Sequence, residues 1–270
     1  MTKTYDDFER PKGKRGTILG IVLGLIAVAG FGVLGYAWKL TADLPGIDDV
    51  TLCPDSGPAG HLAFLIDMTD PVSKTQVQSA RELIALKIAK APVGTRVSLS
   101  TVSPDGTLRD QVFHSICKPP NGEDSSSINS NPRMIAARYK EQFTAPVERA
   151  LGELFLLEEA TSSPIMEALQ EFITQLPGFT TDSDVPRELV LMTDLVQHTD
   201  MFSFYRQHDW IYFRSIGGPE RLAKNMRGVE VTILRVPRTT VSSSTVDEFW
   251  LNYFDTQGAA SVVSRSLGDL

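Results

Sequence analysis

A run of 22 residues without a charge, at 17–38, constrains this chain more than any other feature. As a helix rising about 1.5 Å per residue it would reach roughly 33 Å, which is enough to cross the hydrocarbon core of a bilayer. Basic residues lie just before the run, and acidic residues follow it. The positive-inside rule therefore predicts a single-pass helix of the cell (inner) membrane, with residues 1–16 in the cytoplasm and the rest extracytoplasmic or periplasmic.

A cleaved signal peptide is the alternative for this run. The apolar region of a signal peptide is usually about 7–15 residues long and is followed by small residues at the cleavage site. Here the run is longer and ends in the bulky residues Tyr36, Trp38 and Leu40. We therefore expect an uncleaved anchor, then a linker over 39–60 that is rich in Pro, Gly and Asp, and then one domain over 61–270.

Short apolar runs alternate with helical periodicity beyond residue 60. The runs at 61–67, 187–194 and 229–236 suit strands buried on both faces, as in a parallel sheet. The alternating segments 95–103 and 107–117 flank a Pro-Asp-Gly turn and predict a hairpin. The pattern predicts an α/β fold: a doubly wound, mostly parallel sheet with one antiparallel edge strand, preceded by the transmembrane helix. Helices are expected over 73–91, 133–158, 164–176, 219–228 and 245–259, and an edge strand or a tail in the last ten residues.

Several local features sharpen this prediction. Pro146 marks a break or a new first turn within 133–158. Ser162 and Ser163 can cap the helix that starts at Pro164. The aromatic-rich segment 201–216 is expected to pack in the core, and the alternative is an exposed patch that contacts a partner.

Composition and charge exclude some classes of partner. Hydrophobic residues make up 42% of the chain and charged residues 22%, which allows a proper buried core. The formal net charge of −7, without a basic stripe, argues against a nucleic-acid surface. Cys53 and Cys117 fit no zinc or CxxC spacing. Outside the cytoplasm they would pair as a disulfide, and two buried free thiols are the alternative.

Polar residues follow two of the expected strands and precede one helix. Asp67 ends the strand at 61–67, Asp194 ends the strand at 187–194, and Ser163 precedes the helix at 164–176. Ligands of open α/β sheets bind beyond the carboxyl ends of the strands. Carboxylates and hydroxyls that converge there make a hard oxygen site, suited to Mg²⁺ or another divalent cation.

These segments resemble the von Willebrand factor A family and its metal-ion-dependent adhesion site. FLIDMTDPVS is similar to the family's Asp-x-Ser-x-Ser loop, with Asp67 in the leading place and Thr69 in the first Ser place. Pro71 stands in the second Ser place, and Ser73, two residues beyond, can substitute for it. SPIMEAL resembles Thr-Pro-Leu-x-x-Ala-Leu, and LVLMTDLV resembles the strand that ends in Thr-Asp-Gly. The resemblance covers about residues 61–260 and assigns the metal ligands Asp67, Thr69, Ser73, Ser163 and Asp194.

The resemblance implies a binding module that performs no turnover. In that family a carboxylate of a partner protein usually completes the metal shell, so we expect another protein as partner, in a membrane complex. Two alternatives remain. One is an aspartate-dependent phosphatase or hydrolase with Asp67 as nucleophile, although Thr69 stands where such enzymes carry a second Asp. The other is a metal-free structural scaffold. For Asp70 we expect a role in capping the helix at 73–91.

Overall fold

The computed structural model describes residues 14–42, 46–106, 114–122, 131–155, 160–238 and 241–268. The chain divides into two compact units, Met1–Gly46 and Ile47–Leu270, and each is described by itself. The first contains the helix α1, Lys14–Ala42, which includes the predicted span 17–38. Its segment Gly20–Lys39 is long and apolar enough to cross a membrane, and no part of that segment is buried.

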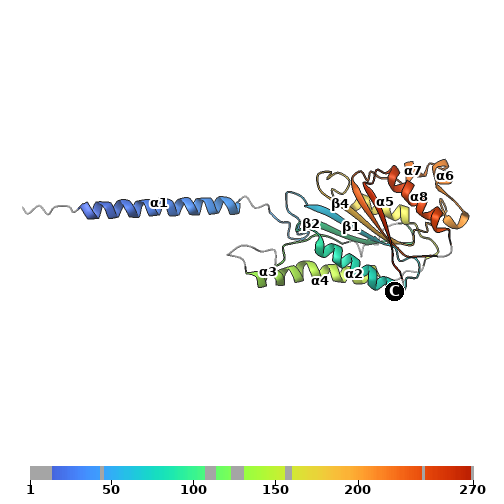
Figure 1. Cartoon of the computed structure of the whole chain (residues 1–270), viewed down its shortest axis with the longest axis horizontal. Helices are drawn as coiled ribbons and strands as arrows, with labels where there is room; N and C mark the ends of the chain where they lie inside the picture. The colour runs from blue at the N-terminus through green and yellow to red at the C-terminus, as the bar shows by residue number, and fades with distance from the viewer. Residues whose placement is uncertain are drawn as a thin grey trace, which may run out of the picture. The chain divides into compact units, whose positions relative to one another are not determined.

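The second unit is built on a six-stranded sheet in the order β3-β2-β1-β4-β5-β6 (Figure 1). β3 runs antiparallel to β2, and every other neighbouring pair is parallel. This arrangement confirms the predicted α/β fold with one antiparallel edge strand. Residues 107–113, where the first part of that edge strand was expected, lie outside the described residues. The strands are β1 Gly60–Ile66, β2 Thr95–Thr101, β3 His114–Cys117, β4 Arg187–Thr193, β5 Val229–Arg235 and β6 Ser261–Ser266.

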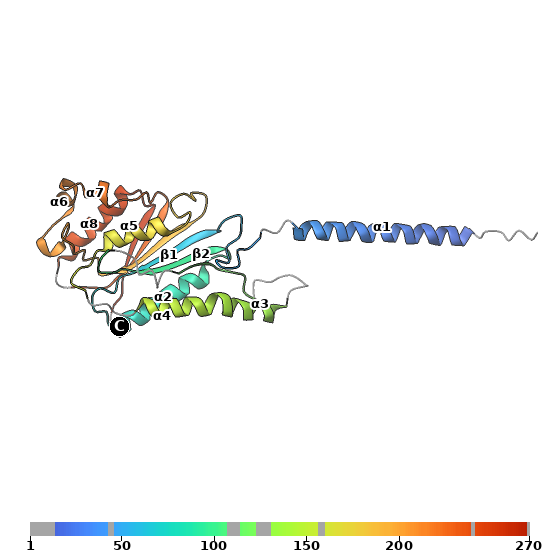
Figure 2. The same ribbon diagram turned by 180° about the vertical axis from the view of Figure 1, so that it is seen from behind.

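Helices cover both faces of the sheet. α5, Ile165–Gln175, and α8, Ser243–Thr256, lie on one face, while α2, Lys74–Lys90, and α4, Ala145–Leu154, lie on the other (Figures 1 and 2). The alternating side chains of β1 supply one core on each face, with Leu65 on the side of α5 and α8 and Phe64 on the side of α2 and α4. Because both faces are covered, β1 is buried along its whole length, as its unbroken apolar sequence predicts.

Pro146 does not interrupt the helix predicted at 133–158. α3, Pro132–Tyr139, continues through a π-helical turn at Lys140–Thr144 into α4, where Pro146 lies in the first turn. Proline has no N–H to donate to the preceding turn of a helix. The wider π turn lies directly before α4, and π-helical residues occur mostly as such single turns inside α-helices. Of the two outcomes expected at Pro146, a break or a new first turn, the structure has the new first turn.

The helix predicted at 219–228 is much shorter than expected. α7 spans only Gly218–Arg221, and the following chain packs against the end of α8 instead. Lys224 N donates to Gln257 Oε1, and Met226 N donates to the Gln257 carbonyl. These bonds satisfy amides that a longer helix would have used internally, and they place Met226 in the core.

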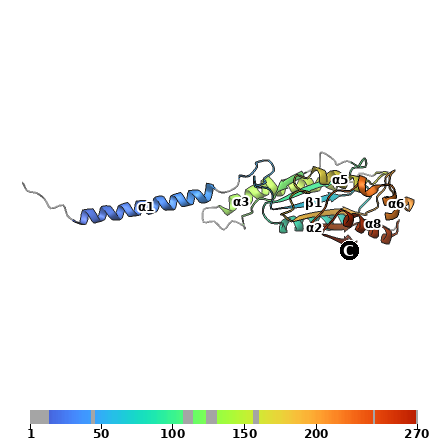
Figure 3. The ribbon, with the colours of Figure 1, turned by 90° about the horizontal axis from the view of Figure 1, so that it is seen from above.

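The aromatic-rich segment 201–216 forms the short helix α6, Trp210–Ser215, and the turn before it. α6 lies beside α8 (Figure 3), with the rings of Phe213 and Phe249 centred 5.2 Å apart. Phe202 and Phe204 are buried in the same core, whereas Tyr205 and Ile211 are exposed. The segment is therefore mainly core, with a few aromatic and apolar side chains left at the surface.

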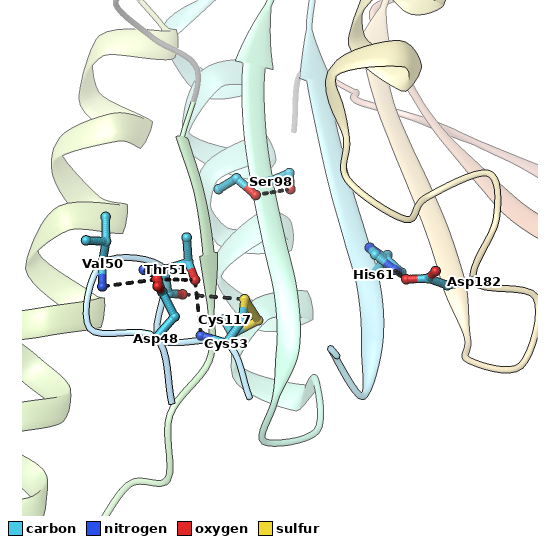
Figure 4. Close-up of a disulfide and its surroundings, with 9 residues drawn as sticks. Asp48, Val50, Thr51, Cys53, His61, Ser98, Cys117 and Asp182 are labelled. Atoms are coloured by element: carbon cyan, nitrogen blue, oxygen red, sulfur yellow. Dashed lines mark hydrogen bonds and ion pairs between the residues drawn. A yellow bond between two sulfur atoms is a disulfide. The ribbon is translucent and has the colours of Figure 1, made fainter. Parts of the chain in front are cut away.

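A disulfide joins Cys53 to Cys117 at the end of β3 (Figure 4). The segment before β1 follows the sheet edge here, and Cys117 N donates to the Thr51 carbonyl over 2.7 Å. The Asp48 carboxylate accepts the Thr51 amide and hydroxyl, which closes a tight turn. Residues 47–59, predicted within the linker, therefore belong to the compact unit of the sheet.

Candidate functional site

Four of the five predicted site residues meet at the carboxyl ends of two adjacent strands. Asp67 and Thr69 follow β1, Asp194 follows β4, and Ser163 precedes α5. All four are buried. β1 and β4 are neighbours at the point where the sheet begins to grow in opposite directions, which is where open α/β sheets bind ligands.

Asp67 lies at the centre of a hydroxyl cluster. Its Oδ1 accepts the Thr69 hydroxyl over 2.6 Å and the Thr69 amide over 3.1 Å. Its Oδ2 accepts the Thr193 hydroxyl over 2.8 Å, and the Ser163 hydroxyl lies 3.4 Å away. Ser163 Oγ is also 3.1 Å from Thr69 Oγ1. Protein donors therefore surround both carboxylate oxygens, as a buried acid requires.

Asp194 is held by a different set of donors. Val196 N donates to its Oδ1 over 2.8 Å, and Arg238 Nε donates to its Oδ2 over 3.0 Å. Arg238 Nη2 also donates to the Pro71 carbonyl over 2.8 Å. The guanidinium thereby links the loop after β1 to the loop after β4.

The buried carboxyls have shifted acidities. The pKa of Asp67 is raised to about 6: burial raises it most, the charge of Asp194 adds to the rise, and the surrounding hydroxyl and amide donors oppose it. Asp70, half-buried beside the cluster, also has a raised pKa, first from burial and then from the charge of Asp194. Negative charge thus accumulates at this end of the sheet, and desolvation makes it costly.

Ser73 is the N-cap of α2. Its hydroxyl accepts the Gln76 amide over 3.1 Å, and the Gln76 side chain accepts the Ser73 amide over 3.0 Å, which completes a capping box. The expectation that Asp70 caps this helix is therefore wrong. Asp70 instead lines a hollow at the cluster.

The expected capping of α5 by Ser162 or Ser163 is also wrong. The N-cap position is Pro164, without a side-chain cap, because Ser163 faces the cluster and Ser162 Oγ donates to the Pro104 carbonyl. Gln197 performs the missing function from a distant loop, since its Oε1 accepts the Met166 amide over 2.9 Å. Gln197 is fully buried.

Leu195 takes a backbone conformation that favours glycine. Its φ is +67°, at the place where the resembled motif carries Gly. Two hydrogen bonds hold it there: Leu195 N donates to Thr193 Oγ1 over 2.9 Å, and Trp250 Nε1 donates to the Leu195 carbonyl over 2.8 Å. The turn that aims Asp194 is therefore kept without glycine, at a cost of about 1–2 kcal/mol in backbone energy.

Sequence reasoning missed two residues that complete the cluster. Thr193 is the last residue of β4, and Arg238 comes three residues after β5 ends. Both lie at carboxyl ends of strands, so the rule that selected Asp67 and Asp194 could have selected them. The pairing of Arg238 with Asp194 could not be foreseen, because it depends on how the loops after β4 and β5 meet.

A hollow of about 210 Å³ opens beside the cluster, and we call it the mouth. A wider hollow of about 510 Å³ adjoins it and shares Thr161, Ser162 and His198 with it. On the rim of the mouth, the rings of His198 and Tyr205 meet edge to face with centroids 5.1 Å apart. Another hollow, of about 410 Å³, lies at the opposite ends of the strands, away from the cluster. The mouth is lined by Asp70, Ala160, Thr161, Ser162, Ser163, Val196, His198 and Tyr205.

The cluster differs from an open divalent-cation site in two respects. Pro71 offers no side-chain oxygen, and its carbonyl is bonded to Arg238. The outer oxygen of Asp194 is bonded to the same guanidinium. As arranged, these donors do not fit a divalent cation unless Arg238 moves, and metal binding by the five residues stays a prediction.

Comparisons with known proteins add little. No protein-family model and no curated protein matches the chain. Among solved structures the chain is similar to an aerotolerance-related membrane protein from Bacteroides fragilis NCTC 9343, carrying multiple mutations to serines. The identity is 11%, the match covers 76% of this chain and 90% of that chain, and the TM-score is 0.35. A likeness at this level carries no argument about function, which rests on the geometry alone.

Proposed function

We propose that the protein is a membrane-anchored binding module that docks another protein at the mouth. The observation that carries this proposal is the convergence of buried polar side chains from three separate segments, next to a hollow with the exposed ring of Tyr205 on its rim. Tyr205 is 50% exposed, and such amphipathic rings commonly anchor protein interfaces. Buried polar groups cost stability, so a binding function would account for their presence at this end of the sheet.

The anchoring part of the proposal is supported by α1. Its apolar side chains are exposed, including Phe31 at 77% and Val28 at 70%. A helix of this length with apolar groups all around needs an apolar environment, and a bilayer supplies one. We propose that the N-terminus faces the cytoplasm and that the sheet lies on the other side. The Cys53–Cys117 disulfide supports that orientation, because such bonds persist in oxidising compartments.

We also propose binding without turnover. A hydrolase of the alternative type would need the Asp67 carboxylate free to attack a substrate. Here Asp67 is 6% exposed, and its oxygens accept hydrogen bonds from Thr69 and Thr193. Those contacts suit a structural support for the mouth better than a nucleophile.

Affinity purification of the full-length protein from its own membranes tests the proposal. We expect Tyr205→Ala to lose a protein that co-purifies with the wild type. Val93→Ala is the matched control, because Val93 is 40% exposed and lies just before β2, away from the mouth. Equal recovery of all co-purifying proteins with both variants would contradict docking at the mouth. Turnover of phosphate esters, abolished by Asp67→Asn, would favour the hydrolase instead.

A further inference from the structure

The guanidinium of Arg238 bridges two of the loops between which the resemblance places a divalent cation. It bonds Asp194 Oδ2 from one side and the Pro71 carbonyl from the other. Asp194 is the aspartate expected as a metal ligand, and Pro71 stands in the loop expected to supply another. Arg238 thus makes, with hydrogen bonds, the link between two loops that a cation would make with coordination bonds.

Arg238 also supplies a positive charge to the cluster, next to a buried carboxylate. The Asp194 side chain is 3% exposed, and that of Arg238 is 26% exposed. Asp67 and Asp70 lie nearby, and the charge of Asp194 raises the pKa of both. A buried carboxylate without a positive partner is strongly destabilising, so the contact with Arg238 offsets a real penalty.

We propose that Arg238 is the built-in cation of this site, replacing the divalent metal ion that the motif resemblance implies. The guanidinium is covalently part of the chain, so the loops after β1 and β4 stay linked without any added ion. Arg238 is a positioning residue in this account. The inference concerns the cluster on which the proposed function rests, but it is tested on the purified protein alone, so its failure is distinguishable from a failure to bind a partner.

Thermal unfolding of the full-length protein in detergent, with EDTA or with Mn²⁺, tests the inference. We expect the Tm of the wild type to be the same in both. Arg238→Met should lower the Tm by roughly 5 °C, a moderate loss because the pair is partly exposed. That variant should regain stability with Mn²⁺, because Asp194 and the Pro71 carbonyl become available to the ion. Adding Asp194→Asn to Arg238→Met should remove the response to Mn²⁺.

Two controls keep the result specific. Arg235 is the last residue of β5 and pairs with Asp247 outside the cluster. Arg235→Met breaks that ion pair, and its Tm should show no response to Mn²⁺. Arg238→Lys keeps the charge and should also show none. A wild-type Tm that rises with Mn²⁺ through Asp194 would overturn the inference. So would an Arg238→Met variant with the wild-type Tm, or one whose lowered Tm ignores Mn²⁺.

Discussion

Thr193 Oγ1 donates to Asp67 Oδ2 over 2.8 Å, and this bond joins the carboxyl ends of the two central strands, β1 and β4. The same hydroxyl oxygen accepts the Leu195 amide, which holds the turn that presents Asp194. One buried side chain therefore supports both carboxylates of the cluster.

Thr193→Val should destabilise the protein by about 1–3 kcal/mol, because a buried carboxylate and a buried amide each lose a partner while the side-chain volume is kept. Thr232→Val is the matched control. Thr232 lies on the neighbouring strand β5, and its hydroxyl donates to Glu188 over 2.8 Å, but Glu188 is less buried and also pairs with Lys87. Denaturant unfolding of both variants measures the difference, and an equal loss in the two would argue against the special role of Thr193.

The Cys53–Cys117 disulfide should contribute about 4 kcal/mol, because it closes a loop with a sequence separation of 64 residues. We expect reductant to lower the Tm of the wild type and to leave a Cys53→Ala/Cys117→Ala variant unchanged. Mass spectrometry of unreduced peptides gives an independent measurement. Free thiols in protein taken from native membranes would contradict an oxidising environment for the sheet.

His61 should make stability depend on pH. Burial lowers its pKa below the ordinary value of 6.5, and the hydrogen bond to Asp182, at 3.1 Å, opposes that shift only in part (Figure 4). The charges of Arg96 and Arg187 lower the pKa further. The folded protein therefore binds a proton less readily than the unfolded chain, so its stability falls as pH drops below about 6.5.

Substitutions at this pair separate that contribution from the other titrating groups. His61→Gln should make the loss of stability between pH 7 and pH 5 shallower. Asp182→Asn should make it steeper, because the group that raises the pKa of His61 is gone. Unfolding free energies at several pH values give the slopes, and identical slopes in the three proteins would exclude His61 as a source.

Ile26→Arg should impair membrane insertion, because an arginine near the centre of a membrane helix costs about 2.5–3.5 kcal/mol. Ile26 is 62% exposed in α1. Val50→Arg is the control, since Val50 is 84% exposed but lies in the compact unit of the sheet. Resistance to alkaline extraction from membranes is the measurement. If the Ile26 variant resists extraction as well as the control does, α1 does not act as the anchor.

β1 and β4 were predictable because each lies in a mainly apolar, buried run that is followed by Asp. β1 and β4 begin and end within a residue of the predicted positions, and Asp67 and Asp194 follow them as expected. The local sequence was sufficient there, because a strand that is buried on both faces needs apolar side chains at nearly every position.

Two of the errors, at the start of α5 and at the end of α7, arose where a distant residue replaced a local contact. Gln197 supports the start of α5, so Ser163 is free to join the cluster. Gln257 takes the amides that would have extended α7. Arg238 reaches Asp194 across a sequence separation of 44 residues. Such contacts depend on which loops the sheet brings together, and no local pattern in a single sequence contains that information.

We propose that the mouth contacts another protein while α1 anchors the chain in the membrane. Photo-crosslinking in intact membranes tests it most directly, with a photoreactive amino acid replacing Tyr205 at the rim or Val93 at the opposite end of the sheet. We expect a discrete crosslinked protein from position 205 that is absent from position 93. Crosslinks from position 93 alone, or the same products from both positions, would contradict it.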